Sequence, residues 1–245
     1  MNRHFFKTIY ILLKLIYATA KMSMETIILS AQNKLSPLWI DQRIQVWVKG
    51  LLHDIKVDLT VINPMHVQPI PGQATLLMCN HASLFDIPLT YAAFPGLCIR
   101  MLAKKELRRV PLMGRSLQAA GFPFVNRQNR QQAMKDLDKV REMLSEGTVM
   151  WIAPEGTRSK TGDLARFKKG GFITAIQAQA HIIPIVIKGA NQILPAKSFR
   201  LSLNQKVQVI VGQPVDASQY SMEQRDELIQ IVHATMQSML DEERP

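Results

Sequence analysis

The segment Cys79–Asp86, with the sequence CNHASLFD, places His81 five residues before Asp86. An aspartate bonded to one ring N–H of a histidine fixes the tautomer and stabilises the imidazolium, so the other ring nitrogen can act as a general base. In a hydrolase such a pair would activate a serine, but the chain has no Gly-x-Ser-x-Gly elbow. Ser83 fits better as the first residue of a capping box. The pair therefore predicts deprotonation of a hydroxyl that the substrate brings.

Cysteine chemistry is the second possibility in this segment. Cys79 could be a nucleophile beside His81, but a buried thiol at the end of an apolar strand is the more common role of a free cysteine. Cys79 and Cys98 are the two cysteines of the chain, which fits a reduced compartment and forms no metal-ligand pattern. We expect no metal and no cofactor.

Basic residues follow several predicted strands. In Pro154–Ser159 (PEGTRS), Gly156 permits a tight turn and Arg158 offers a bidentate fork for a phosphate. Each such cluster alone is more often a surface turn, and together they predict a phosphate-binding rim. Its other candidate members are Lys104, Arg127, Glu155, Thr157 and Lys168, the last at a predicted helix N-terminus that suits an anion.

The elements that must position these residues can be predicted from hydrophobic period. Short apolar runs rich in β-branched residues predict strands at 55–62, 74–79, 97–102, 121–125, 148–153, 182–187 and 206–211. Helical periodicity predicts helices at 84–93, 112–120, 128–145, 169–180 and 222–240, with Pro88 interrupting the first of them. Alternating strands and helices predict an α/β fold, in which a mixed sheet is covered by helices and ligands bind beyond the strand ends.

Charge is concentrated in the middle of the chain. The formal net charge is +11, and residues 100–169 hold 16 Lys or Arg against 7 Asp or Glu. This predicts an anionic partner, although a solvated basic face is the plain alternative. A nucleic-acid-binding module would interleave aromatic residues with the basic ones, and few occur here. We therefore expect no nucleic acid partner.

The N-terminus resembles a signal peptide, but Lys14 divides its apolar stretch into two runs of six residues. Arg3, Lys7, Lys14 and Lys21 fall on one side of a helix, and apolar residues occupy its other faces. A second amphipathic segment follows Ser36-Pro37. The pair predicts docking on an anionic membrane surface, without a spanning segment. Two helices that pack on the core are the alternative.

Four blocks, in order, resemble those of the 1-acyl-sn-glycerol-3-phosphate (lysophosphatidate) acyltransferase family. They are NHASLFD, GFPFVNR, PEGTRS and the Ile183-Pro184-Ile185 strand, and the likeness extends over residues 74–190. Two positions depart from the family pattern: Asn126 stands where aspartate is frequent, and Arg166 precedes Phe167 in place of proline. Both lie near the expected acceptor site, so the acceptor's identity stays open.

The resemblance implies a 1-acylglycerol-3-phosphate O-acyltransferase that moves a fatty acyl group from acyl-CoA or acyl-carrier protein to the sn-2 hydroxyl of the lysophospholipid, giving phosphatidic acid. It implies His81 as general base and Asp86 as its partner. Lys104, Arg127, Glu155, Gly156, Thr157, Arg158 and Lys168 would then line the glycerophosphate site.

The expected organisation is a membrane-docking pair of helices at residues 1–53 and an α/β acyltransferase domain at residues 54–245. We expect a peripheral protein on the cytoplasmic face of a bacterial inner membrane. Alternatives are acylation of another lysolipid such as lyso-ornithine lipid, a lipid esterase, and a basic lipid- or RNA-binding protein without catalysis.

Overall fold

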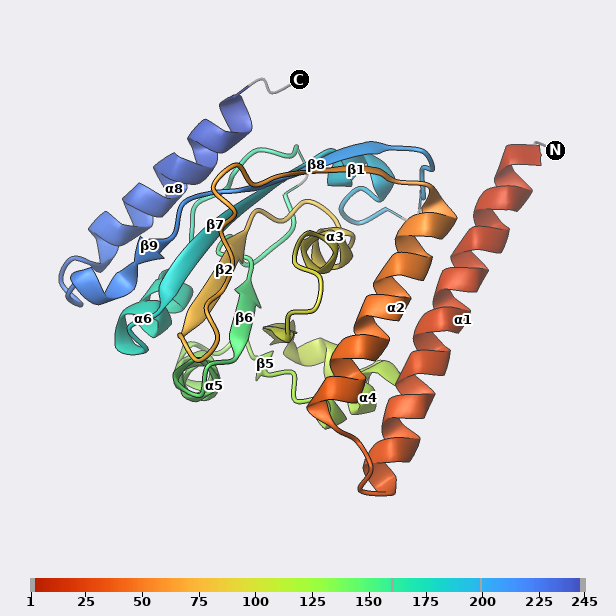
Figure 1. Ribbon diagram of the computed structural model, residues 1–245, viewed down its shortest axis with the longest axis horizontal. Helices are drawn as coiled ribbons and strands as arrows, with labels where there is room; N and C mark the ends of the chain where they lie inside the picture. The colour runs from red at the N-terminus through yellow and green to blue at the C-terminus, as the bar shows by residue number, and fades with distance from the viewer. Residues whose placement is uncertain (1–2, 160, 199, 243–245) are drawn as a thin grey trace.

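A mixed sheet runs through the centre of the computed structural model, which describes residues 3–159, 161–198 and 200–242 (Figure 1). Its strand order is β1-β8-β7-β2-β6-β3, with β9 added beside β7. Strands β8 and β9 are antiparallel to β7, and the other neighbouring pairs are parallel. The predicted α/β class is confirmed. The strands are β1 Asp58–Ile62, β2 Thr75–Cys79, β3 Ile99–Met101, β6 Val149–Ile152, β7 His181–Lys188, β8 Lys206–Val211 and β9 Val215–Asp216.

Helices cover both faces of this sheet. One core lies under α5, α6 and α8, and the other lies under α2 and α3, because successive side chains of the strands point to opposite faces. Leu76 of β2 belongs to the first core and Leu77 to the second. In chain order, the helices that follow the first strands are α3 Asp86–Ala93, α4 Met113–Ala119, α5 Arg130–Ser145, α6 Lys169–Gln177, α7 Ala190–Ile193 and α8 Arg225–Asp241, with short 3-10 helices at Lys105–Arg109 and Ala217–Gln219.

Two long helices precede the sheet, α1 Arg3–Ala31 and α2 Pro37–Ile55. Ser36 caps α2 by accepting a hydrogen bond from the Trp39 N–H, and Pro37 occupies the first helical position, where its missing N–H has no helical partner to lose. Because α2 continues to Ile55 and ends at the left-handed Lys56, the strand predicted from residue 55 begins only at Asp58.

The helix pair packs against the rest of the protein. Ile11 and Leu15 of α1 are buried, as are five apolar residues of α2. Lys14 Nζ forms an ion pair with Asp54 of α2 at 2.6 Å, which links the two helices. The prediction for Lys14 was contact with lipid headgroups, whereas the structure pairs it within the protein. The side chains of Arg3 and Lys7 lie outside the described residues. In the described part of the chain, none of the helices combines the length and the apolarity needed to cross a bilayer.

One predicted strand lies outside the main sheet. Of residues 121–125, only Phe124–Val125 form a strand, β5, which pairs in parallel with β4 Ala103–Lys104 in a separate two-stranded ladder. The segment that carries Arg127 therefore does not leave an edge of the main sheet, and the contacts of its loop decide where the arginine lies.

Candidate active site

His81 and Asp86 form a fixed pair in the loop between β2 and α3. His81 Nδ1 lies 2.8 Å from Asp86 Oδ2, and the same oxygen accepts the backbone N–H groups of Ala82 and Ser83, each at 2.8 Å. Only 1% of the Asp86 side chain is exposed. Pro88 does not interrupt α3, because it is the third residue of the helix and N–H groups of the first turn need no helical acceptor.

Ser83 organises the loop. Its N–H donates to Asp86 Oδ2, which is one half of the predicted capping box. The other half is absent, because Ser83 Oγ accepts from the Phe85 N–H at 3.2 Å and Phe85 is the N-cap of α3. The hydroxyl also donates to the Leu194 carbonyl at 2.9 Å, and the residue is fully buried. The hydroxyl is bonded and buried, so no exposed serine nucleophile lies at this position.

The main chain of His81 is held on both sides by the Glu155–Ser159 segment. Its N–H donates to Glu155 Oε1 at 2.8 Å, and its carbonyl accepts from the Ser159 N–H at 2.6 Å. The other Glu155 oxygen accepts the Ala165 N–H at 3.0 Å, and the residue is 2% exposed. Burial raises the pKa of Glu155, while the two backbone donors lower it. We name this arrangement the His81 clamp. The roles of Ser159 and Ala165 in this arrangement were not predicted.

Two further supports were not predicted. The Asn80 side chain donates to the Ile187 carbonyl and accepts the Ile187 N–H, which extends the pairing of β2 and β7 past the end of β2. The Trp151 ring meets the His81 ring edge-on, with centroids 5.7 Å apart, and its Nε1 donates to Thr90 Oγ1. A buried asparagine directly after an apolar strand was the available signal for the first support.

Other predicted site residues lie around the clamp. Arg127 donates from its guanidinium to the Gly156 carbonyl, so the two loops meet as the rim hypothesis requires. Gly156 has a φ of +74°, and a Cβ there would lie 3.3 Å from Lys168 Cγ. Arg158 is half-buried and has no hydrogen-bond or ion-pair partner among the described residues. Thr157 is exposed.

Lys104 is the outlying member of the predicted rim. It pairs with Val125 in the small ladder, and Val125 lies two residues before Arg127 in the chain. Its side chain is exposed and lies 3.7 Å from Glu106. No contact links Lys104 to the His81–Asp86 pair in the described part of the chain, so its predicted role at an acceptor site has only its position near Arg127 in support.

Cys79 is buried at the end of β2, with no exposed surface. Burial raises the pKa of its thiol well above the ordinary value, so the thiolate that a nucleophile needs is disfavoured. The buried-thiol alternative is the one that the geometry supports. Among the described residues, no group of three or more His, Cys, Asp or Glu could hold a metal ion.

An apolar cavity of about 440 Å³ opens beside the loop that carries His81 and Asp86. Leu84 and Phe85, from the same loop as His81, form one part of its wall, and α1, α2 and α4 form most of the rest. His81 keeps 15% of its side chain exposed, and Nε2 has no hydrogen-bond partner among the described residues. The residues on either side of Asp86, Phe85 and Ile87, line the pocket, so the His81–Asp86 pair stands on the loop that borders it. Lining residues include Leu12, Leu15, Met22, Trp39, Ile44, Trp47, Leu107, Leu117 and Leu201.

Comparisons with known proteins agree on one family. A family model described as Acyltransferase matches residues 58–188. The 1-acyl-sn-glycerol-3-phosphate acyltransferase beta of Homo sapiens is 36% identical over 141 residues, which are 57% of this chain and 50% of that protein. The 1-acyl-sn-glycerol-3-phosphate acyltransferase of Saccharomyces cerevisiae is 32% identical over 162 residues, 65% of this chain and 52% of that protein. The chain spans about half the length of the curated relatives it matches.

A solved structure shares the fold over nearly the whole chain. The 1-acyl-sn-glycerophosphate (LPA) acyltransferase PlsC from Thermotoga maritima superposes with a TM-score of 0.77 and covers 99% of this chain and 98% of its own. The sequence identity is 21%, so this likeness concerns the fold alone. It includes the two N-terminal helices as well as the sheet.

Proposed function

The chain belongs to the acyltransferase family, and from that premise we propose that it moves a fatty acyl group from a thioester donor to the free hydroxyl of 1-acyl-sn-glycerol-3-phosphate. The observation that carries this proposal is the position of the His81–Asp86 pair beside a large apolar cavity. The names of the matched human and yeast relatives support the choice of acceptor.

In the proposed reaction His81 acts as general base. Nε2 accepts the proton of the acceptor hydroxyl while the oxygen bonds to the thioester carbonyl carbon. The tetrahedral intermediate then collapses, the carbon–sulfur bond breaks, and the imidazolium returns its proton to the leaving thiolate. Asp86 keeps the Nδ1 proton in place and stabilises the imidazolium. The thioester is already activated, so no covalent enzyme intermediate is required.

Arg158 and Arg127 are the proposed contacts of the acceptor phosphate. Arg158 has an unpaired guanidinium among the described residues, and a guanidinium binds phosphate through two parallel hydrogen bonds. Arg127 is fixed to the Gly156 carbonyl, which supports a role in shaping the loop as well as in supplying charge. Glu155 has both carboxylate oxygens bonded to backbone N–H groups. We therefore propose that Glu155 positions His81 and does not touch the acceptor.

Residues 1–53 are proposed to dock on an anionic membrane, and residues 54–245 to form the catalytic domain. One face of α1 packs inward through Ile11 and Leu15, and the opposite face is also apolar and exposed. An exposed apolar patch of this extent marks an interaction surface. This outer face of α1 comprises Ile9, Tyr10, Leu13, Ile16, Tyr17, Met24 and Ile28.

Docking can be tested without disturbing the core. Removing α1 would uncover the apolar cavity, so we choose Leu13→Asp together with Tyr17→Asp, two positions at least 60% exposed. The double variant should sediment poorly with vesicles that contain phosphatidylglycerol and should keep its melting temperature. Ile70→Asp, equally exposed but far from α1 in sequence, is the matched control. Unchanged sedimentation of the double variant would refute the docking surface.

The activity test uses the purified full chain with an acyl-CoA and 1-acyl-sn-glycerol-3-phosphate. We expect thiol release with matching formation of phosphatidic acid, detected by mass spectrometry, and neither with His81→Ala. Free fatty acid in place of phosphatidic acid would identify an esterase. Transfer to a lyso-ornithine lipid but not to lysophosphatidate would contradict the proposed acceptor and keep the reaction type.

A further inference from the structure

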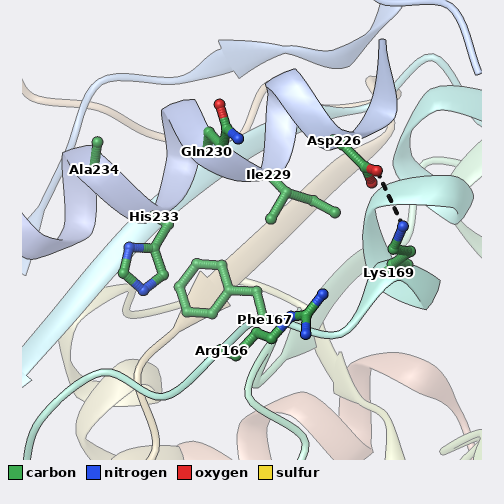
Figure 2. A pocket seen from close by; sticks show the side chains of 8 residues that line it. All are labelled: Arg166, Phe167, Lys169, Asp226, Ile229, Gln230, His233 and Ala234. Atoms are coloured by element: carbon green, nitrogen blue, oxygen red, sulfur yellow. Dashed lines mark hydrogen bonds and ion pairs between the residues drawn. The ribbon is translucent and has the colours of Figure 1, made fainter. Parts of the chain in front are cut away.

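A second pocket, of about 580 Å³, lies on the other side of the sheet from α1 and α2 (Figure 1). Figure 2 shows its walls, which are the segment Arg166–Lys169 and the first turns of α8. We call it the α6–α8 pocket. Its lining residues are Arg166, Phe167, Lys169, Asp226, Ile229, Gln230, His233 and Ala234.

The wall of this pocket is continuous with the catalytic loop. The N–H of Ala165, directly before Arg166, donates to Glu155 Oε2 at 3.0 Å, and the Lys168 N–H donates to the Pro154 carbonyl at 2.8 Å. The same Glu155 holds the main chain of His81. A ligand in the α6–α8 pocket would therefore sit against the segment that positions the proposed base.

The chemistry of the lining suits an anion that carries a flat ring. Arg166 is exposed and has no acidic partner among the described residues. The one acidic residue of the lining, Asp226, is already paired with Lys169 at 3.0 Å and with Arg225 at 3.0 Å. The half-exposed His233 ring packs beside the buried Phe167 ring, with centroids 4.7 Å apart and planes tilted by 57° (Figure 2). Among the described residues, the pocket thus combines one unpaired cation, Arg166, with an aromatic surface, and its volume is that of a small-molecule site.

We propose that the α6–α8 pocket binds the nucleotide end of the acyl donor, a phosphorylated adenosine of the coenzyme A type. This inference rests on the proposed acyl transfer. The acyl chain would occupy the apolar cavity on the α1 side, the thioester would lie at His81, and the nucleotide would reach the opposite side of the catalytic loop. Arg166 would bind phosphate, and His233 would stack against the adenine. A carrier-protein donor has a pantetheine arm without a nucleotide, so it would leave this pocket empty.

Three thioesters with the same acyl chain separate the contributions: octanoyl-CoA, octanoyl-dephospho-CoA and octanoyl-pantetheine, each with lysophosphatidate as acceptor. Arg166→Ala should raise the KM for octanoyl-CoA about tenfold, the loss of roughly one charge-assisted hydrogen bond at a partly solvated site. It should leave the KM for octanoyl-pantetheine unchanged. His233→Ala should weaken both nucleotide-bearing donors. Lys135→Ala, which removes an exposed cation from α5, is the matched control and should change neither.

Calorimetry with adenosine 3′,5′-bisphosphate tests the pocket without catalysis. The unmodified protein should bind it, Arg166→Ala should bind about tenfold more weakly, and Lys135→Ala should bind normally. The inference would be overturned if Arg166→Ala changed the KM for the CoA and pantetheine donors equally. It would also be overturned if Arg166→Ala left the affinity for the bisphosphate unchanged. An equal dependence of a carrier-protein donor on Arg166 would also overturn it. Absence of transfer from every thioester would refute the proposed function, and the calorimetry would still decide the pocket.

Discussion

The Glu155→Gln variant tests whether Glu155 positions His81, the proposed base, or binds the acceptor. The carboxylate accepts the His81 N–H at 2.8 Å and the Ala165 N–H at 3.0 Å, and it is 2% exposed. Glutamine has nearly the same shape, but its amide nitrogen cannot accept a hydrogen bond. One of the two buried N–H groups therefore loses its acceptor, and the other bonds to a neutral oxygen in place of a charged one.

The expected loss of stability follows from these two bonds. A hydrogen bond to a charged group contributes about 1.5–3 kcal/mol, and an unsatisfied buried donor costs about 1–3 kcal/mol. Because these overlap, we expect the free energy of unfolding to fall by about 2 kcal/mol. For a chain of this size that is a decrease in melting temperature of roughly 4–8 °C. The protein should stay folded, since domains are typically stable by about 5–15 kcal/mol.

The kinetic effect should appear in turnover. A displacement of about 1 Å in a reacting group can reduce the rate roughly 100-fold, so we expect kcat to fall 10- to 100-fold. The KM for lysophosphatidate should change by less than about twofold, because the acceptor does not touch Glu155 in this scheme. Glu155→Asp keeps the charge but is one methylene too short to reach both donors, so its kcat should be intermediate.

The assay is steady-state kinetics with both substrates varied, together with thermal melts. Glu146→Gln, at an exposed position after α5, is the control and should behave like the unmodified protein. A variant at Glu155 that keeps its kcat and raises the KM for lysophosphatidate would refute the clamp. Glu155 would then be a substrate contact, as the sequence resemblance implies.

Four further predictions concern the pair, the phosphate, an ion pair and the thiol. His81→Ala should lower kcat roughly 10²- to 10⁴-fold, Asp86→Asn should also lower it heavily, and the double variant should be little worse than His81→Ala; multiplying losses would show that the two act separately. Arg158→Lys should raise the KM for lysophosphatidate much more than that for the donor, because a point charge cannot replace the guanidinium fork; equal increases would place Arg158 elsewhere. Hydrogen bonds from Arg225 and Lys169 lower the pKa of Asp226 to about 2, below its unfolded value, so their stabilisation is present above about pH 4 and is lost as the pH falls towards 2. Between these pH values the melting temperature of Asp226→Asn should therefore fall less steeply than that of the unmodified protein, and an equal fall would contradict the assignment. Cys79→Ala should retain turnover, and iodoacetamide should leave Cys79 unmodified in the native protein at pH 8, as mass spectrometry would show, because burial raises the pKa of this thiol.

The local part of the site could be predicted from the sequence. His81, Ser83 and Asp86 lie within six residues, so their bonds depend on one loop and one helix start. The apolar runs that became β2, β6 and β7 are equally local, since a strand buried on both faces is a continuous hydrophobic run. The family also follows from short motifs, because each one encodes a strand end and a turn that neighbouring residues build.

Tertiary structure decided what those motifs do to one another. Glu155 lies 74 residues from His81, and only the packing of β2 beside β6 brings its carboxylate to the His81 N–H. No periodicity marks such a bond, because one partner is a backbone group that every residue possesses. The same holds for α1, whose two apolar faces look alike in sequence. One became part of the core and the other stayed exposed, because α2 and α4 cover only one side of the helix.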